Sequence, residues 1–120
     1  MPITRTPINL PASIAINTAI SNVIPMGDFS GGLVVTPAAW DAAAIAFKVC
    51  DTPGGTFVPL RSQTGAIVEI TNIVTSAACA YPLPDELFGA LFFQIWSEST
   101  GAGTDTNQTA SRSLIVTLKG

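Results

Sequence analysis

The sequence predicts an all-β protein, an antiparallel β-sandwich of about eight strands. Short runs alternate apolar and polar residues, as in residues 44–50, where Ile45, Phe47 and Val49 fall on one side. Nine prolines and ten glycines punctuate the chain between these runs. No apolar period of 3.6 residues persists beyond about two turns. Evenly spaced short strands with turn signals between them favour a sandwich or barrel over parallel β-α-β units.

The first half of the chain predicts an N-terminal arm followed by short strands. Residues 3–10 alternate weakly and contain Pro7, which suits an arm or an edge strand because proline cannot donate to a central ladder. We therefore expect residues 1–12 to form the arm and residues 13–120 to form a single domain. The further elements expected here are extended runs at 13–16, 20–24, 32–36 and 44–50, with a turn at 26–28 and a single helical turn at 37–43.

The second half predicts further strands joined by polar turns. Residues 91–97 form the most hydrophobic run, with apolar residues on both faces. Such a run is typical of a central strand buried on both sides, or of one whose outer face meets a partner. The other elements expected here are strands at 56–60, 66–73, 77–81 and 111–118, a helical turn at 85–88, and loops at 51–55 and 99–110.

The low charge of the chain indicates a surface that meets other protein. Only 11% of the residues are charged and 48% are hydrophobic, whereas a soluble domain carries roughly 25% charge. A surface made polar by Ser, Thr and Asn is the alternative. The net charge is −3 and the five basic residues are scattered, which argues against nucleic acid as a partner. The longest uncharged stretch, residues 6–27, contains three prolines and therefore fits neither a membrane span nor a signal peptide.

The residue types argue against catalysis. There is no histidine to act as a base, and there is no nucleophile elbow or phosphate-binding motif. We expect a non-enzymatic protein without cofactor or metal, made in the cytosol. The loop around Asp105 and Asn107 has oxygen ligands for Ca²⁺ but one carboxylate, so a structural loop is favoured. Cys50 and Cys79 lack paired spacing and are interpreted as apolar thiols, with a disulfide as the alternative.

Four polar or aromatic side chains invite a specific role. Gln108 lies four residues before Arg112, and the two could brace the base of the polar loop, together with a carboxylate. The alternative for Arg112 is contact with a partner. Trp40, in a turn beside Asp41, is expected either to be partly exposed or to cap the end of the sandwich. Trp96, within an apolar strand, is expected in the core.

Several motifs together resemble a known group of proteins. They are Trp40-Asp-Ala-Ala43 before a strand, Gly55-Thr-Phe57 in a hairpin, and Gln108-x-x-x-Arg112 before the last strand. Over residues 27–119 the chain resembles small structural proteins of tailed bacteriophages and prophages. That resemblance implies a jelly-roll-like or galactose-binding-like β-sandwich in the virion. It also implies a capsid decoration or cement protein that binds the major capsid protein and copies of itself.

The expected partner interface follows from the arm and the exposed candidates. Ile3, Ile8 and Leu10 would add a strand to a neighbour's sheet edge, and Trp40 and Arg112 would contact the partner. One alternative is a tail, baseplate or head-fibre component that binds host glycan through Trp40, Tyr81 and the 99–110 loop. A secreted lectin-like module is a third hypothesis, which a Cys50–Cys79 disulfide would favour.

Overall fold

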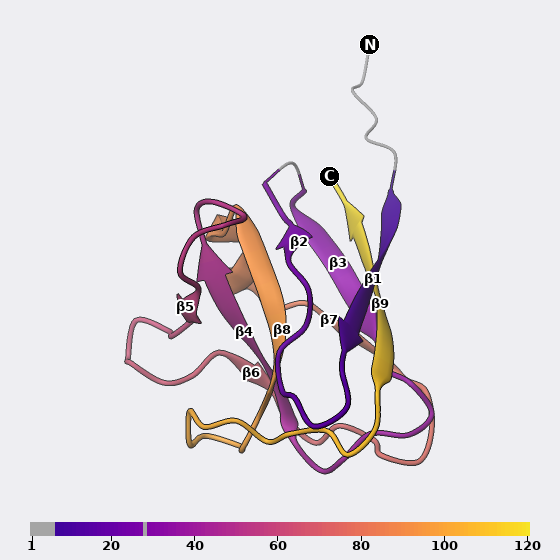
Figure 1. Cartoon of the computed structure of the whole chain (residues 1–120). Helices are drawn as coiled ribbons and strands as arrows, with labels where there is room; N and C mark the ends of the chain where they lie inside the picture. Colours follow the sequence, from indigo (N-terminus) through magenta and orange to yellow (C-terminus); the bar gives the residue numbers. More distant parts are fainter. Residues whose placement is uncertain (1–6, 28) are drawn as a thin grey trace.

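Two antiparallel β-sheets pack face to face in the computed structural model, which describes residues 7–27 and 29–120 (Figure 1). Sheet A has the order β1 (Ile8–Ile14), β9 (Arg112–Lys119), β3 (Gly31–Val35) and β7 (Ala80–Pro82). Sheet B has the order β2 (Ile24–Pro25), β8 (Phe92–Glu98), β4 (Ala44–Cys50) and β5 (Val58–Pro59), and β6 (Glu69–Ile70) also pairs with β4. A 3₁₀ turn, η1 (Asp85–Gly89), precedes β8. The all-β sandwich is confirmed, with nine strands instead of about eight.

The core lies between the sheets and is built from alternate residues of the long strands. Phe47 of β4 and Phe93 of β8 meet edge to face, with ring centroids 5.9 Å apart. From sheet A, every second residue of β9 is buried against them: Leu114, Val116 and Leu118. This alternation buries one face of β9. In β4, residues 44–47 are all buried, so this strand is buried on both faces at its start although the pattern of residues 44–50 predicts one buried face.

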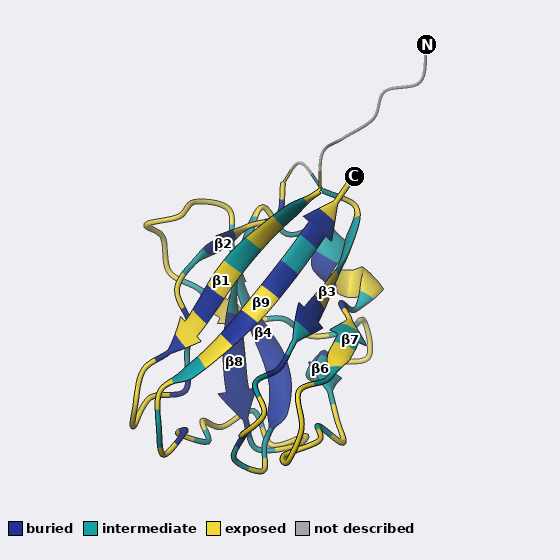
Figure 2. Ribbon diagram, turned by 90° about the vertical axis from the view of Figure 1, so that its right-hand side faces the viewer, coloured by how far each residue is buried: buried dark blue, intermediate teal, exposed yellow. Residues whose placement is uncertain are grey.

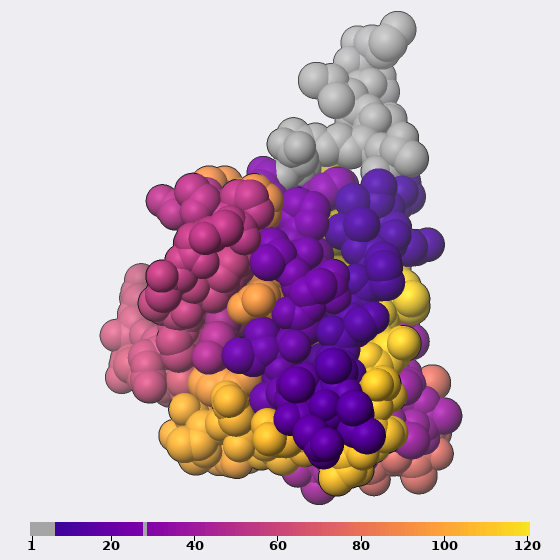
Figure 3. Space-filling view, in the orientation of Figure 1, coloured from indigo at the N-terminus to yellow at the C-terminus, as the bar shows by residue number. Residues whose placement is uncertain are grey.

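Strand β8 is buried on both faces, but the chain itself covers its outer face. Trp96 packs on Ala19, Ala46, Ile20 and Ile67, from the segments before β2 and β6 and from β4. Figure 3 shows residues between β1 and β3 lying across β8, little of which is visible from that side. The prediction of a central strand is therefore confirmed, and so is the prediction that Trp96 belongs to the core. No partner is needed to cover this strand.

The boundary predicted after residue 12 is wrong, because residues 8–12 belong to the sandwich. Strand β1 pairs with β9 from Ile8↔Leu118 to Ile14↔Arg112. Its ladder tolerates Pro11 because β1 is an edge strand and Pro11 turns its backbone away from β9. The prolines at 7 and 11 obscured this strand in the sequence. Ile3 lies outside the described residues.

Candidate protein-binding face

The register of sheet A places side chains of its outer face in two rows across four strands. One row is Pro11, Ile115, Val35 and Ala80, and the next is Asn9, Thr117, Leu33 and Pro82. Figure 2 shows this face toward the viewer, with exposed and buried residues alternating along β1 and β9.

None of the side chains in the two rows is charged. The apolar members include Ile115 and Leu33, which are 42% and 43% exposed. The polar members, Asn9 and Thr117, are hydrogen-bonded to each other: the Thr117 hydroxyl donates to Asn9 Oδ1 at 2.7 Å. Large apolar side chains exposed together on a flat sheet are unusual in a monomer and indicate an interaction surface.

The size of the face fits a specific but small interface. Four strands spaced about 4.8 Å apart span about 19 Å, and the eight residues of β9 extend about 26 Å. Because β3 and β7 are shorter than β9, the face offers at most about 500 Å², and a matching partner brings the total buried area to at most about 1,000 Å². That total is below the range of about 1,200–2,000 Å² for stable specific interfaces and fits a small contact that is repeated in an assembly.

The sheet edges, in contrast, are protected against strand addition. Four of the strands at the sheet edges contain a proline, and β6, which also pairs with β4 at an edge, does not; the prolines are Pro11, Pro82, Pro25 and Pro59. At the β1 edge, the Asn22 amide donates to Pro11 O at 3.1 Å, and its Oδ1 accepts from Ser13 N at 2.8 Å. Asn22 thus occupies two of the backbone groups that an added strand would need, next to Pro11 and Ser13. Ile8 and Leu10 pack against the chain's own core, and pairing of residues 8–10 with a neighbour's sheet stays a prediction.

Trp40 is a core residue, so its assignment to the interface is wrong. Its side chain is 3% exposed, and its Nε1–H donates to Ala43 O at 3.2 Å. The turn between β3 and β4 folds the indole inward, as a cap over the sandwich end would require. This is one of the two arrangements that the sequence left open.

Arg112 and Gln108 brace the end of the last loop, as predicted. Arg112 Nε donates to Gln108 Oε1 at 3.0 Å, and Arg112 Nη2 donates to Asp41 Oδ1 at 2.9 Å. Gln108 is fully buried; its Oε1 also accepts from Asp41 N, and its Nε2 donates to Ser97 Oγ. Hydrogen bonds from the Thr109 backbone and hydroxyl, together with the Arg112 guanidinium, hold the pKa of Asp41 below its ordinary value.

This geometry favours one of the two roles considered for Arg112. Its side chain is 12% exposed and its guanidinium bonds to Gln108 and Asp41, which favours the bracing role, while contact of Arg112 with a partner stays a prediction. Asp41 is the carboxylate that completes the brace. The sequence does not reveal it, because it lies 71 residues before Arg112.

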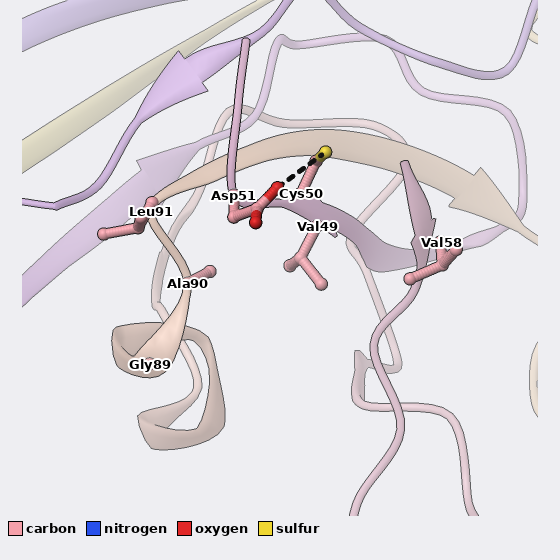
Figure 4. Close-up of a pocket in the computed structure, with 7 residues that line it drawn as sticks. All are labelled: Val49, Cys50, Asp51, Val58, Gly89, Ala90 and Leu91. Atoms are coloured by element: carbon pink, nitrogen blue, oxygen red, sulfur yellow. Dashed lines mark hydrogen bonds between the residues drawn. The ribbon is translucent and has the colours of Figure 1, made fainter. Parts of the chain in front are cut away.

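A shallow apolar hollow of about 410 Å³ lies between the ends of β4 and β5 and the segment after η1 (Figure 4). Val58 and Leu91 are about half exposed at its rim, and the Cys50 thiol donates to Asp51 Oδ1 at 3.8 Å. Cys50 and Cys79 are both free. The hollow contains no paired acid and base, so its chemistry is that of apolar contact.

In the polar loop after β8, the aspartate Asp105 has a structural role. Asp105 Oδ1 accepts from Trp96 Nε1 at 2.7 Å, which leaves this carboxylate engaged with the core indole. Across residues 7–27 and 29–120, no group of three or more His, Cys, Asp or Glu side chains is arranged to hold a metal ion. Nor does this part of the chain form a helix of the length and apolarity that crossing a membrane requires.

Comparison with known proteins found no relative of this chain. No family model matches the chain, and neither the curated proteins nor the solved structures yielded a match.

Proposed function

We propose that the chain is a non-enzymatic structural protein of a tailed-phage virion, a capsid decoration or cement protein that docks through the outer face of sheet A. The observation that carries this proposal is the pair of uncharged rows across that face. The resemblance of residues 27–119 to small virion proteins supplies the class of assembly. The major capsid protein and further copies of this chain are the partners we propose.

The physics of such docking favours a face without charge. Burying apolar surface contributes about 25 cal/mol per Å², whereas burying an unpaired charge is costly. Ile115, Leu33 and Val35 can be covered without that cost. The nearest charge on this face is Lys119, at the end of β9, where it can stay in solvent at the rim of a contact.

Protected edges fit the same role. A protein that must bind at defined places on a shell gains from having no free strand edge, because edge pairing leads to open-ended aggregation. Asn22 and the edge prolines provide this protection. Docking by a face replaces the strand addition that the sequence suggested.

The glycan-binding alternative loses its main aromatic candidate. Trp40 and Trp96 are both buried, so neither can stack on a sugar ring. Tyr81 is half-buried, and its hydroxyl accepts from Val74 N at 2.8 Å. We therefore keep the decoration role as the proposed function.

The test compares two charge insertions at exposed apolar positions. Ile115→Glu places a carboxylate in the centre of the face, and Ile16→Glu places one at a position that is 55% exposed in the turn after β1. Each variant, with an epitope tag, is expressed in a bacterial host in which the proposed phage assembles. Phage particles are then purified by density gradient and imaged with gold-labelled antibody.

We expect the unmodified protein and Ile16→Glu to label phage heads, and Ile115→Glu to be absent from them while remaining folded. Labelling of tails alone would support the tail-component alternative. If no particle carries the unmodified protein, or if Ile115→Glu labels heads as strongly as Ile16→Glu, the proposal is wrong.

A further inference from the structure

A buried carboxyl group at the end of β8 has one oxygen without a partner. Glu98 is fully buried; its Oε1 accepts from Gly103 N at 2.8 Å, while its Oε2 has no hydrogen-bond partner. Burying an ionised oxygen in this way is costly, so a proton or a cation is expected to compensate it. No third acidic ligand is placed nearby among the described residues, which favours the proton.

The neighbour that can share this proton is Glu69 of β6. Both strands flank β4, where Glu98 pairs with Ala44 and Glu69 with Ala46. Burial, together with the neighbouring Glu69 carboxyl group, raises the pKa of Glu98 to about 7. Protonated Glu98 can donate its O–H to the Glu69 carboxylate, which satisfies the orphaned oxygen.

Each carboxyl group also holds the loop that follows β8. Gly101 N donates to Glu69 Oε2 at 3.1 Å, and Gly103 N donates to Glu98 Oε1 at 2.8 Å. Both glycines have positive φ, 72° and 70°, which lets the loop turn its N–H groups toward the carboxyl pair. The loop of residues 99–106 is therefore fastened to both strands by acceptors that belong to one carboxyl pair.

The other charged groups around the pair are engaged elsewhere. Asp105 bridges to Glu98 along the backbone, but its carboxylate accepts from the Trp96 indole. Arg61 lies near Gly103 and donates to Gly65 O, and Lys48 lies over the Trp96 ring at 4.8 Å. Neither Arg61 nor Lys48 forms a salt bridge with Glu69 or Glu98 within the described residues.

We propose that Glu69 and Glu98 share one proton and form a pH-dependent clasp, which fastens the loop of residues 99–106 most strongly in acid and least strongly above neutral pH. When the proton leaves to solvent, two adjacent carboxylates remain, one of them buried. Lifting the loop hydrates Glu98 and relieves both the repulsion and the desolvation.

The direction of this pH dependence follows from the raised pKa of Glu98. The Glu98 carboxyl has a pKa of about 7 when the loop is closed and 4.5 when the loop is open, so its protonated form favours the closed loop. The free energy that favours closure is largest below pH 4.5, declines between pH 4.5 and 7, and is constant above pH 7. The loop-opening equilibrium should therefore rise by about a hundredfold or more over that interval.

The test uses the whole chain with ¹³C-labelled glutamate, followed by NMR between pH 4 and 9. We expect the Glu98 carboxyl to titrate near pH 7 instead of near 4.5. Protection of the Gly101 and Gly103 amides against hydrogen exchange should fall about a hundredfold between pH 4.5 and 7, after correction for intrinsic exchange. Amides of β9 serve as the internal reference.

Two variants separate a shared proton from a merely structural contact. Glu98→Gln keeps a donor toward Glu69, so protection of the loop amides should no longer depend on pH. Glu69→Gln, at a half-buried position, should lower the midpoint of Glu98. Titration of Glu98 near pH 4.5 in the unmodified chain, or unchanged pH dependence in Glu98→Gln, would overturn the proposal.

Discussion

The brace at Gln108 gives the sharpest stability prediction. Gln108→Ala removes three hydrogen bonds at a fully buried position: two that its Oε1 accepts, from Asp41 N and Arg112 Nε, and one that its Nε2 donates to Ser97 Oγ. A neutral bond contributes about 1 kcal/mol and one with a charged group about 1.5–3 kcal/mol. We expect the free energy of unfolding to fall by about 3–5 kcal/mol.

That loss is large compared with a total stability of about 5–15 kcal/mol. It is measured by urea unfolding, with Asn107→Ala as the control, because Asn107 is the exposed neighbour in the same loop. The control should change stability by no more than about 0.5 kcal/mol. A cost below about 1 kcal/mol for Gln108→Ala would mean that the brace does not hold the loop, and the role assigned to Arg112 would have to be revised.

Two further substitutions test the packing. Gly32→Ala should destabilise the protein by about 1–3 kcal/mol, because its Cβ would clash with Thr117 O; Gly31→Ala, with open space at its Cβ, is the matched control in the same thermal melts. Trp40→Ala should cost about 3–5 kcal/mol, as expected for a buried aromatic, and Trp40→Phe should cost less. Equal melting temperatures for Gly32→Ala and Gly31→Ala, or a stable Trp40→Ala, would contradict the packing described above.

The sequence pattern revealed the sandwich wherever alternation was uninterrupted. Residues 44–50 and 111–118 alternate cleanly, and both regions are long strands. For residues 3–10 the sequence left an arm or an edge strand open, and β1 is an edge strand. The sequence did not show that residues 8–12 pair along β9, which Pro11 permits because its carbonyl points toward Asn22 instead of β9.

The site was less accessible to sequence reasoning, because it depends on register between distant segments. Low charge predicted a protein-covered surface, with residues 6–27 and 91–96 as its main sources. The second segment is instead covered by the chain's own Ala19 and Ile20. The face of sheet A combines residues as far apart as Pro11, Val35 and Ile115, and only the pairing of β1, β9 and β3 places them in one row.

The Gln108–Arg112 brace could be predicted because the two residues lie four positions apart. Its carboxylate, Asp41, and the Glu69–Glu98 pair come from distant parts of the chain and meet only in the folded protein. Asp41 lies 71 residues from Arg112, and Gly101 lies 32 residues from the Glu69 that accepts its N–H. Contacts of this kind have no local signal in one sequence.

A cryo-EM map of the particle that contains this chain tests the docking face most directly. The account predicts that Ile115 and Leu33 lie against a neighbouring subunit, on a phage head, with the β1 edge free of any added strand. A map in which this face is open to solvent, or in which a neighbour's strand pairs along β1, would contradict it.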